Sequence, residues 1–384
     1  MGIIFTILAI IIGIFLLGIL VFVHEAGHFF TAKFFKVKVE EFGFGFPPRL
    51  WGKKRGETIY SINAIPAGGF VRLFGEDGEE RGDPRSFAAK GPWVRATIIA
   101  AGVMVNLVVA FLLFSILLAV NNFRSDIPTD LPFSGKTLET SFPFGQQTNG
   151  VLIEYVLPVS TAEKAGIKSL DEVVTADGQT FNSIGAFQEF IQVNKGNAVN
   201  FEVYNILDRS SRSVVAVPRE NPPEGEGALG VYLSNVATIR YESLPDKILV
   251  GPAHSVNMLY FQAQALGSLF SRAIEERSAE PVARTVSGPV GIVAMLGAFI
   301  GKTGTSGIFA LLETIALLSL ILAVMNLLPI PALDGGRFFF TIFEGVTHRK
   351  VSQNVEHWVH TVGFTVLIVL FLLITYNDVV KIFH

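Results

Sequence analysis

Four long apolar segments stand out in the pattern of hydrophobic and polar positions along the 384 residues. Each is close to the ~20 residues of helix that are needed to cross the hydrocarbon core of a bilayer. They run from Ile3 to Val23, from Thr97 to Val120, from about Ile308 to Leu328 and from Trp358 to about Tyr376. The pattern therefore predicts four transmembrane helices.

The first apolar segment also has an alternative interpretation, because an N-terminal apolar run can be a secretory signal. It has no basic region before it and no small-residue cleavage site after it, and it continues directly into His24. We therefore expect a retained transmembrane helix.

The segment from Val37 to Phe74 has a different pattern, with short extended stretches broken by glycine and proline. This pattern predicts a β-hairpin or small sheet beside the membrane. The alternating Phe and Gly residues from Phe42 to Phe46 would place aromatic rings in the bilayer or over a cavity. The alternative is a cytoplasmic turn region that packs its own core.

A compact α+β domain is expected between the second and third apolar segments. Its predicted strands and helices are Val151 to Leu157, Thr161 to Ala165, Glu172 to Ala176, Ser183 to Gln192, Asn200 to Ile206 and Arg212 to Val217. A linker rich in Pro, Ser, Thr and Gly, from Phe123 to Thr148, precedes the domain, and Pro222 to Gly227 marks its far edge. Two segments, from Leu244 to Ile274 and from Ser287 to Ile300, then predict helices on the outer membrane surface.

The expected fold class is thus a polytopic α-helical membrane protein with four transmembrane helices, a membrane-associated β-hairpin or sheet and an inserted α+β domain. The expected boundaries are 1–36 (first helix), 37–75 (β region), 76–120 (connector and second helix), 121–149 (linker), 150–220 (inserted domain), 221–307 (linker and surface helices), 308–340 (third helix) and 341–384 (fourth helix).

Composition supports a membrane protein and narrows the possible chemistry. Half of the residues are hydrophobic and only 16% are charged. The net charge of −3 gives no indication of a nucleic-acid partner. Cysteine is absent, which excludes disulfides and thiolate metal sites, so that any metal would be held by histidine and carboxylate groups.

The basic residues of the loops predict the orientation. Lys and Arg are numerous between the first two apolar segments, and the short link between the last two carries Arg337, Arg349 and Lys350. Loops of this kind stay in the cytoplasm, whereas long loops are translocated regardless of charge. The stretch from Asn121 to about Gly307 and both termini are therefore expected outside the cytoplasm.

His24, Glu25 and His28 form an H-E-x-x-H pattern at the inner end of the first apolar segment. On a helix, histidines at i and i+4 lie on one face and can bind one zinc ion, while the glutamate between them can act as catalytic base. Ionisable residues in an apolar span are costly unless they are paired, hydrated or bound to metal. The alternative is three ordinary interfacial residues at a helix end.

A catalytic zinc ion usually takes a third protein ligand. His357 and His360 are candidates, but they suit an interfacial helix end better. Asp334 is the better candidate, because it follows the third apolar segment where two prolines end the helix, although it could also simply cap the next helix. The predicted topology brings His28 and Asp334 to the same, cytoplasmic side.

These features together resemble the site-2 protease family of intramembrane metalloproteases, and within it the bacterial branch of the regulator of sigma-E protease. The residues that carry the resemblance are H-E-x-x-H, the run Asn326 to Gly335, the motif Ala101 to Asn106 and an inserted domain that looks like a single PDZ domain. Pro66 to Val71 and Gly288 to Ile292 also resemble that branch. Two departures are a single PDZ-like unit where tandem ones are familiar and Val103 where proline is common.

The resemblance implies that His24, His28 and Asp334 bind Zn2+ and that Glu25 activates water. It also implies that Asn326 and Pro329 hold an extended substrate. Strand addition to the edge strand from Gly69 to Phe74, which includes Phe70, or to the hairpin from Phe42 to Phe46 would serve the same purpose. Expected partners are transmembrane protein substrates such as anti-sigma factors and leftover signal peptides, together with the lipid bilayer of the bacterial inner membrane. The PDZ-like domain would filter substrates by size or bind exposed C-termini, or serve only as a spacer.

Two other functions remain as alternatives at this point. A membrane scaffold or chaperone would use the PDZ-like domain and a non-hydrolytic metal site, although the presence of Glu25 argues for hydrolysis. A metal transporter would need polar residues across the spans, and Glu313 is the main one.

Overall fold

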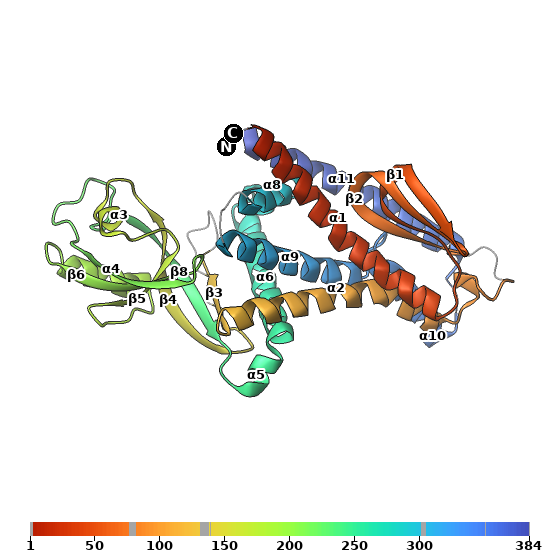
Figure 1. Cartoon of the computed structure of the whole chain (residues 1–384), viewed down its shortest axis with the longest axis horizontal. Helices are drawn as coiled ribbons and strands as arrows, with labels where there is room; N and C mark the ends of the chain where they lie inside the picture. Colours follow the sequence, from red (N-terminus) through yellow and green to blue (C-terminus); the bar gives the residue numbers. More distant parts are fainter. Residues whose placement is uncertain are drawn as a thin grey trace. The chain divides into compact units, whose positions relative to one another are not determined.

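The computed structural model describes residues 3–76, 82–130, 138, 140–300, 305–349 and 351–383. Within these ranges, four helices are long and apolar enough to cross a membrane, as the sequence predicts (Figure 1). They are α1 (Ile3–Phe34), α2 (Pro92–Val120), α9 (Thr305–Leu327) and α11 (Gln353–Phe383). Helix α1 continues through the H-E-x-x-H residues, so all three lie on regular helix.

The chain forms two compact units. The first contains Met1–Leu113, Ser287–Lys302 and Leu311–His384, and the second contains Phe114–Val286 and Thr303–Ala310.

The first unit contains an antiparallel sheet made of two long strands, β1 (Val39–Arg55) and β2 (Thr58–Leu73), which contacts α1 (Figure 1). Residues 39–44 of β1 pair with two parts of β2, residues 59–62 on one side and residues 69–73 on the other. Strand β2 therefore bends around this part of β1. Among the strands that the structure describes, residues 69–73 therefore form an edge of the sheet and pair on one side with β1.

The aromatic rings of β1 pack on helix α1. The ring of Phe42 stacks on those of Phe29 and Phe22, with centroids 4.6 and 4.8 Å apart, and Phe44 makes edge contacts with Phe22 and Phe15. Such ring pairs add stabilisation beyond the area they bury. These contacts fix the sheet against the helix that carries H-E-x-x-H.

Short helices complete the first unit: η1 (Phe87–Ala89), α8 (Pro289–Ile300) and α10 (Asp334–Thr347). The carboxylate of Asp378 in α11 accepts hydrogen bonds from the backbone N–H groups of Gly288 and Gly291 at the start of α8. A carboxylate suits a helix N-terminus, where backbone N–H groups have no partner within the helix. This contact explains the Gly288 to Ile292 motif as a helix-anchoring feature.

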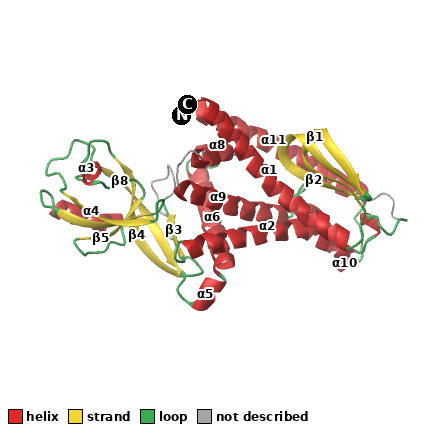
Figure 2. Cartoon of the chain, viewed as in Figure 1, coloured by secondary structure: helices red, strands yellow, loops and turns green. Residues whose placement is uncertain are grey.

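The second unit is built on a six-stranded antiparallel sheet in the order β3-β8-β4-β5-β6-β7 (Figure 2). The strands are β3 (Arg124–Pro128), β4 (Gln146–Val156), β5 (Asp171–Ala176), β6 (Val199–Asn205), β7 (Ser210–Ala216) and β8 (Val231–Arg240). Helices α3 (Thr161–Ala165) and α4 (Ile184–Val193) contribute to its apolar core, which includes Phe187 and Phe201. Helices α5 (Leu244–Ile248), α6 (Val250–Glu275) and α7 (Glu280–Thr285) follow the sheet.

The structure differs from the sequence-based expectation at three places in this unit. The expected linker 121–149 contains β3 and the first residues of β4. The sheet also extends beyond residue 220, because β8 returns after the Pro222 to Gly227 turn and pairs with β3 and β4. The expected helix from Leu244 to Ile274 is interrupted at Leu249, where Pro252 in the first turn of α6 has no N–H to continue α5.

Candidate metal centre

Helix α1 brings His24, Glu25 and His28 together on adjacent turns. The candidate ligand atoms of the three side chains all lie within 4.8 Å of one another. His24 is 4% exposed and His28 is 7% exposed, so both imidazoles are shielded from solvent. A regular helix therefore presents two ring nitrogens and a carboxylate in one small volume.

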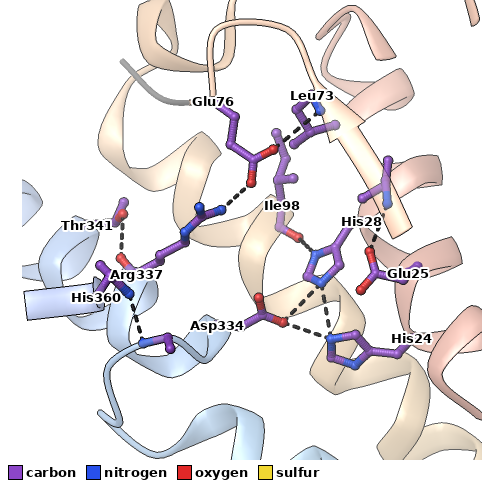
Figure 3. A network of polar contacts seen from close by, with 12 residues as sticks. His24, Glu25, His28, Leu73, Glu76, Ile98, Asp334, Arg337, Thr341 and His360 are labelled. Atoms are coloured by element: carbon purple, nitrogen blue, oxygen red, sulfur yellow. Dashed lines mark hydrogen bonds and ion pairs between the residues drawn. The ribbon is translucent and has the colours of Figure 1, made fainter. Parts of the chain in front are cut away.

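Asp334 reaches the same place from the other end of the chain. Helix α9 ends at Leu327, and the chain turns through two prolines before α10 begins at Asp334. Gly335 is required in this turn, because a Cβ there would collide with the carbonyl oxygen of Leu328. As a result, Asp334 Oδ2 lies 2.8 Å from His24 Nε2 and 3.1 Å from His28 Nε2 (Figure 3).

The three donor atoms fit a zinc ion. The two Nε2 atoms are 3.2 Å apart, so the three separations span 2.8 to 3.2 Å. A tetrahedral zinc ion with ligands at about 2.0–2.2 Å holds its ligand atoms about 3.3–3.6 Å apart, so small outward shifts of the three side chains would admit the ion. His28 Nδ1 lies 2.9 Å from the carbonyl oxygen of Ile98, which can only accept a hydrogen bond. The proton of His28 therefore resides on Nδ1, and its Nε2 lone pair is free for a metal.

Asp334 is held in its ionised form. Burial raises the pKa of this carboxyl, but the neighbouring His24 and His28 side chains outweigh burial and hold its pKa below the ordinary value. The helix that carries it is also fixed: Arg337 of α10 donates to the Glu76 carboxylate, which accepts a hydrogen bond from the N–H of Leu73 at the end of β2 (Figure 3).

Glu25 lies between the donor atoms and the edge of the sheet. Its Oε2 accepts a hydrogen bond of 3.2 Å from the backbone N–H of Val71 in β2 (Figure 3). Glu25 also lines a cavity of about 240 Å³. The cavity is lined by Val21, His24, Glu25, Asn106, Leu322, Asn326, Ala332, Leu333 and Asp334. A small substrate group in this cavity would therefore meet both the donor atoms and a carboxylate base.

The other candidate residues occupy different places. Asn326 lines the cavity from the last turn of α9, whereas Pro329 is exposed and does not line it. Gly69 and Phe70 lie in β2, directly before Val71.

Among the described residues, His357 and His360 of α11 do not belong to the cluster of His24, Glu25 and His28. His360 instead accepts a hydrogen bond of 2.9 Å from the N–H of Ala332, through its Nδ1 atom. It therefore supports the loop that presents Asp334.

Gly102 and Asn106 also belong to the site, although no role for them is expected from the sequence. A Cβ on Gly102 would lie 2.5 Å from His28 Nε2 and 2.7 Å from His24 Nε2, so only glycine fits there. Asn106 is fully buried, and its amide lies 3.3 Å from His24 Nδ1. Gly102 and Asn106 are four residues apart, which places both on the face of α2 toward α1. In the sequence, Asn106 is marked as a polar residue inside an apolar span.

The apolar helices and this set of donor atoms are typical of metal-dependent hydrolases of membranes. The family model of peptidase family M50 matches residues 12–370. The chain therefore belongs to peptidase family M50, the site-2 proteases.

Individual relatives align with nearly the whole chain. A protein of Clostridium acetobutylicum named as a zinc metalloprotease is 32% identical over 371 residues, which are 97% of each chain. The zinc metalloprotease RasP of Geobacillus kaustophilus is 26% identical over 458 residues, covering 98% of this chain and 99% of the relative. A Nostoc protein, also named as a zinc metalloprotease, is 29% identical over 371 residues, or 94% of this chain and 93% of the relative. The expectation of a zinc metalloprotease is confirmed.

Proposed function

We propose that the protein cuts peptide bonds within the transmembrane segments of single-span membrane proteins. His24, His28 and Asp334 bind the zinc ion, and Glu25 is the catalytic base. The observation that supports this assignment is the meeting of three donor atoms within 3.2 Å, beside a further carboxylate and a cavity.

The chain's own residues supply proton transfer and orientation. Bound zinc supplies a Lewis acid that polarises the scissile carbonyl and lowers the pKa of water. Glu25 accepts the proton of the attacking water and delivers it to the leaving amide nitrogen, which is the general-base and general-acid role. The carbonyl of Ile98 keeps the proton of His28 on Nδ1 throughout.

A helical substrate must be unwound before its backbone can be attacked, and the edge of the β sheet is suited to hold it extended. In the described part of the chain, residues 69–73 pair with β1 on one side, and on the other side the N–H of Val71 is directed at Glu25. A substrate strand added to this edge would lie beside the catalytic base. Gly69 and Phe70 then contact the substrate backbone, together with Asn326 and the Pro329 turn.

The inserted α+β domain acts as a PDZ-like substrate filter or as a site for exposed C-termini, with a passive spacer as the alternative. We propose that it lies outside the cytoplasm of a bacterial inner membrane, with the active site toward the cytoplasmic side and both termini outside. Anti-sigma factors and remnant signal peptides are the proposed substrates. Removal of the domain, including β8, is expected to change the range of substrates cut while zinc content is retained; an unchanged range would favour the spacer.

The central experiment compares the purified protein with Glu25→Gln and His24→Ala variants. Bound zinc is measured by elemental analysis, and cleavage is measured on a single-span substrate in detergent. Glu25→Gln is expected to bind zinc normally and to lose cleavage by at least about 100-fold, the usual contribution of a general base. His24→Ala is expected to lose both. Equal cleavage by Glu25→Gln and the unchanged protein would refute the assignment.

A further inference from the structure

Each metal-binding imidazole has a second ring nitrogen whose hydrogen-bond partner decides where the proton resides. A ligand that offers Nε2 to a metal must carry its proton on Nδ1, and Nδ1–H then needs an acceptor. For His28 that acceptor is the carbonyl oxygen of Ile98, at 2.9 Å. The corresponding partner of His24 is not a carbonyl of the main chain.

The neighbour of His24 Nδ1 is the side-chain amide of Asn106. In the amide orientation of the structure, the nitrogen Nδ2 of Asn106 lies 3.3 Å from His24 Nδ1. The amide oxygen Oδ1 is buried and has no hydrogen-bond partner within the described residues. Asn106 itself is 0% exposed, so an unpaired oxygen there would carry the full cost of leaving water.

A half-turn of the amide about its terminal bond brings Oδ1 to His24 Nδ1. The two ends of an asparagine amide have nearly the same shape, and which end faces a neighbour is assigned from the hydrogen-bond network. With Nε2 facing the other donor atoms, His24 presents Nδ1–H, and two donors would meet in the orientation drawn. After the half-turn, Oδ1 accepts the hydrogen bond from Nδ1–H.

We propose that Asn106 is a positioning residue, whose side-chain oxygen accepts the hydrogen bond from His24 Nδ1 and holds His24 Nε2 toward the metal. This inference rests on the proposed ligand set of His24, His28 and Asp334. Asn106 does not touch the zinc ion, and it acts only through His24.

The main chain of Asn106 takes part in a contact between two helices. Its main-chain oxygen accepts a hydrogen bond of 2.9 Å from Ser319 Oγ, which joins α2 to α9 in the first unit. One turn earlier, Gly102 packs directly against both imidazoles. Two residues on one face of α2 therefore serve the histidines, Gly102 by leaving space for both rings and Asn106 by accepting a hydrogen bond from His24.

The test measures zinc affinity of the purified full chain by competition with a chelator. Asn106→Leu keeps the size but removes the acceptor, and its zinc affinity is expected to fall by about 10- to 100-fold, as for other outer partners of metal ligands. Asn106→Asp keeps an acceptor at the same place and is expected to bind zinc at least as tightly as the unchanged protein. Ser319→Ala is the matched control. It removes a hydrogen bond to the main-chain oxygen of Asn106 but leaves the side-chain amide of Asn106 unchanged, so zinc affinity should not change.

The outcomes separate this inference from the proposed function. If His24→Ala loses zinc but Asn106→Leu binds it normally, the role of Asn106 is refuted and the ligand set stands. If His24→Ala binds zinc normally, the ligand set itself is refuted. Should Asn106→Leu fail to fold, Asn106→Asp still decides, because a tenfold loss of zinc affinity in that variant would overturn the acceptor role.

Discussion

Replacing Gly102 by alanine adds one methyl group at the point where α2 meets the two imidazoles. A Cβ at this position would lie 2.5 Å from His28 Nε2 and 2.7 Å from His24 Nε2, the two nitrogens that face Asp334. Real Cβ atoms essentially never approach a heavy atom closer than 3.0 Å. The substitution therefore displaces the ligand atoms themselves.

The size of the displacement follows from these distances. His28 Nε2 must move by at least 0.5 Å, the difference between the 3.0 Å limit and the 2.5 Å contact. The ring has little freedom to move, because its Nδ1 is hydrogen-bonded to Ile98 at 2.9 Å. Metal sites tolerate about 0.2 Å in ligand distances. We therefore expect Gly102→Ala to lower zinc affinity at least about tenfold, and cleavage by about 100-fold, as misplaced catalytic groups do.

Zinc affinity and thermal unfolding should be measured on the same preparation in detergent. Alanine favours helix over glycine by about 1 kcal/mol, so stability of the metal-free protein can be retained while zinc affinity falls. Gly267→Ala is the matched control, because Gly267 lies in helix α6 and a Cβ there meets no atom within 4 Å. Wild-type zinc affinity in Gly102→Ala would show that the imidazoles do not occupy the positions described.

Two further predictions concern the sheet edge and the second unit. Val71→Pro removes the backbone N–H that is directed at Glu25, so the cleavage rate should fall about 100-fold while zinc is retained. The control Val71→Ala keeps that N–H, and its cleavage rate should stay within a few-fold of that of the unchanged protein. Normal cleavage by Val71→Pro would exclude strand addition at this edge. Burial lowers the pKa of His254 from 6.5 to about 4, so the neutral ring is favoured in the fold. Its stabilisation is complete above about pH 6.5 and is lost, by about 3 kcal/mol, as the pH falls toward 4. Thermal unfolding at both pH values tests this, and His254→Phe should show a smaller pH dependence; an equal dependence would contradict it.

The division of the chain into elements could be predicted well because it depends on local patterns. Apolar runs of membrane-spanning length are formed by consecutive residues, and all four correspond to helices. The strands and helices from Val151 to Ala216 were also predictable, since alternation, capping residues and turn glycines are local signals. H-E-x-x-H belongs to the same category, because its meaning depends only on a spacing of four residues along one helix.

Pairing between distant segments was less accessible. Along the chain, strand β8 is separated from β4 by three other strands, β5, β6 and β7, and by the Pro222 to Gly227 turn, so no local signal shows that β4 and β8 pair. The double pairing of residues 39–44, which leaves residues 69–73 as an edge, is likewise a property of register rather than of sequence pattern.

By itself, the sequence indicated a membrane protein and supplied two of its proposed metal ligands, and it made Asp334 the best third candidate by topology. Only the tertiary structure decided which groups surround the imidazoles: the space at Gly102, the carbonyl of Ile98 and the amide of Asn106 all come from α2. The physical reason is that a metal centre needs its ligand atoms fixed within a few tenths of an ångström. That accuracy is set by side-chain packing between helices, which a one-dimensional pattern does not contain.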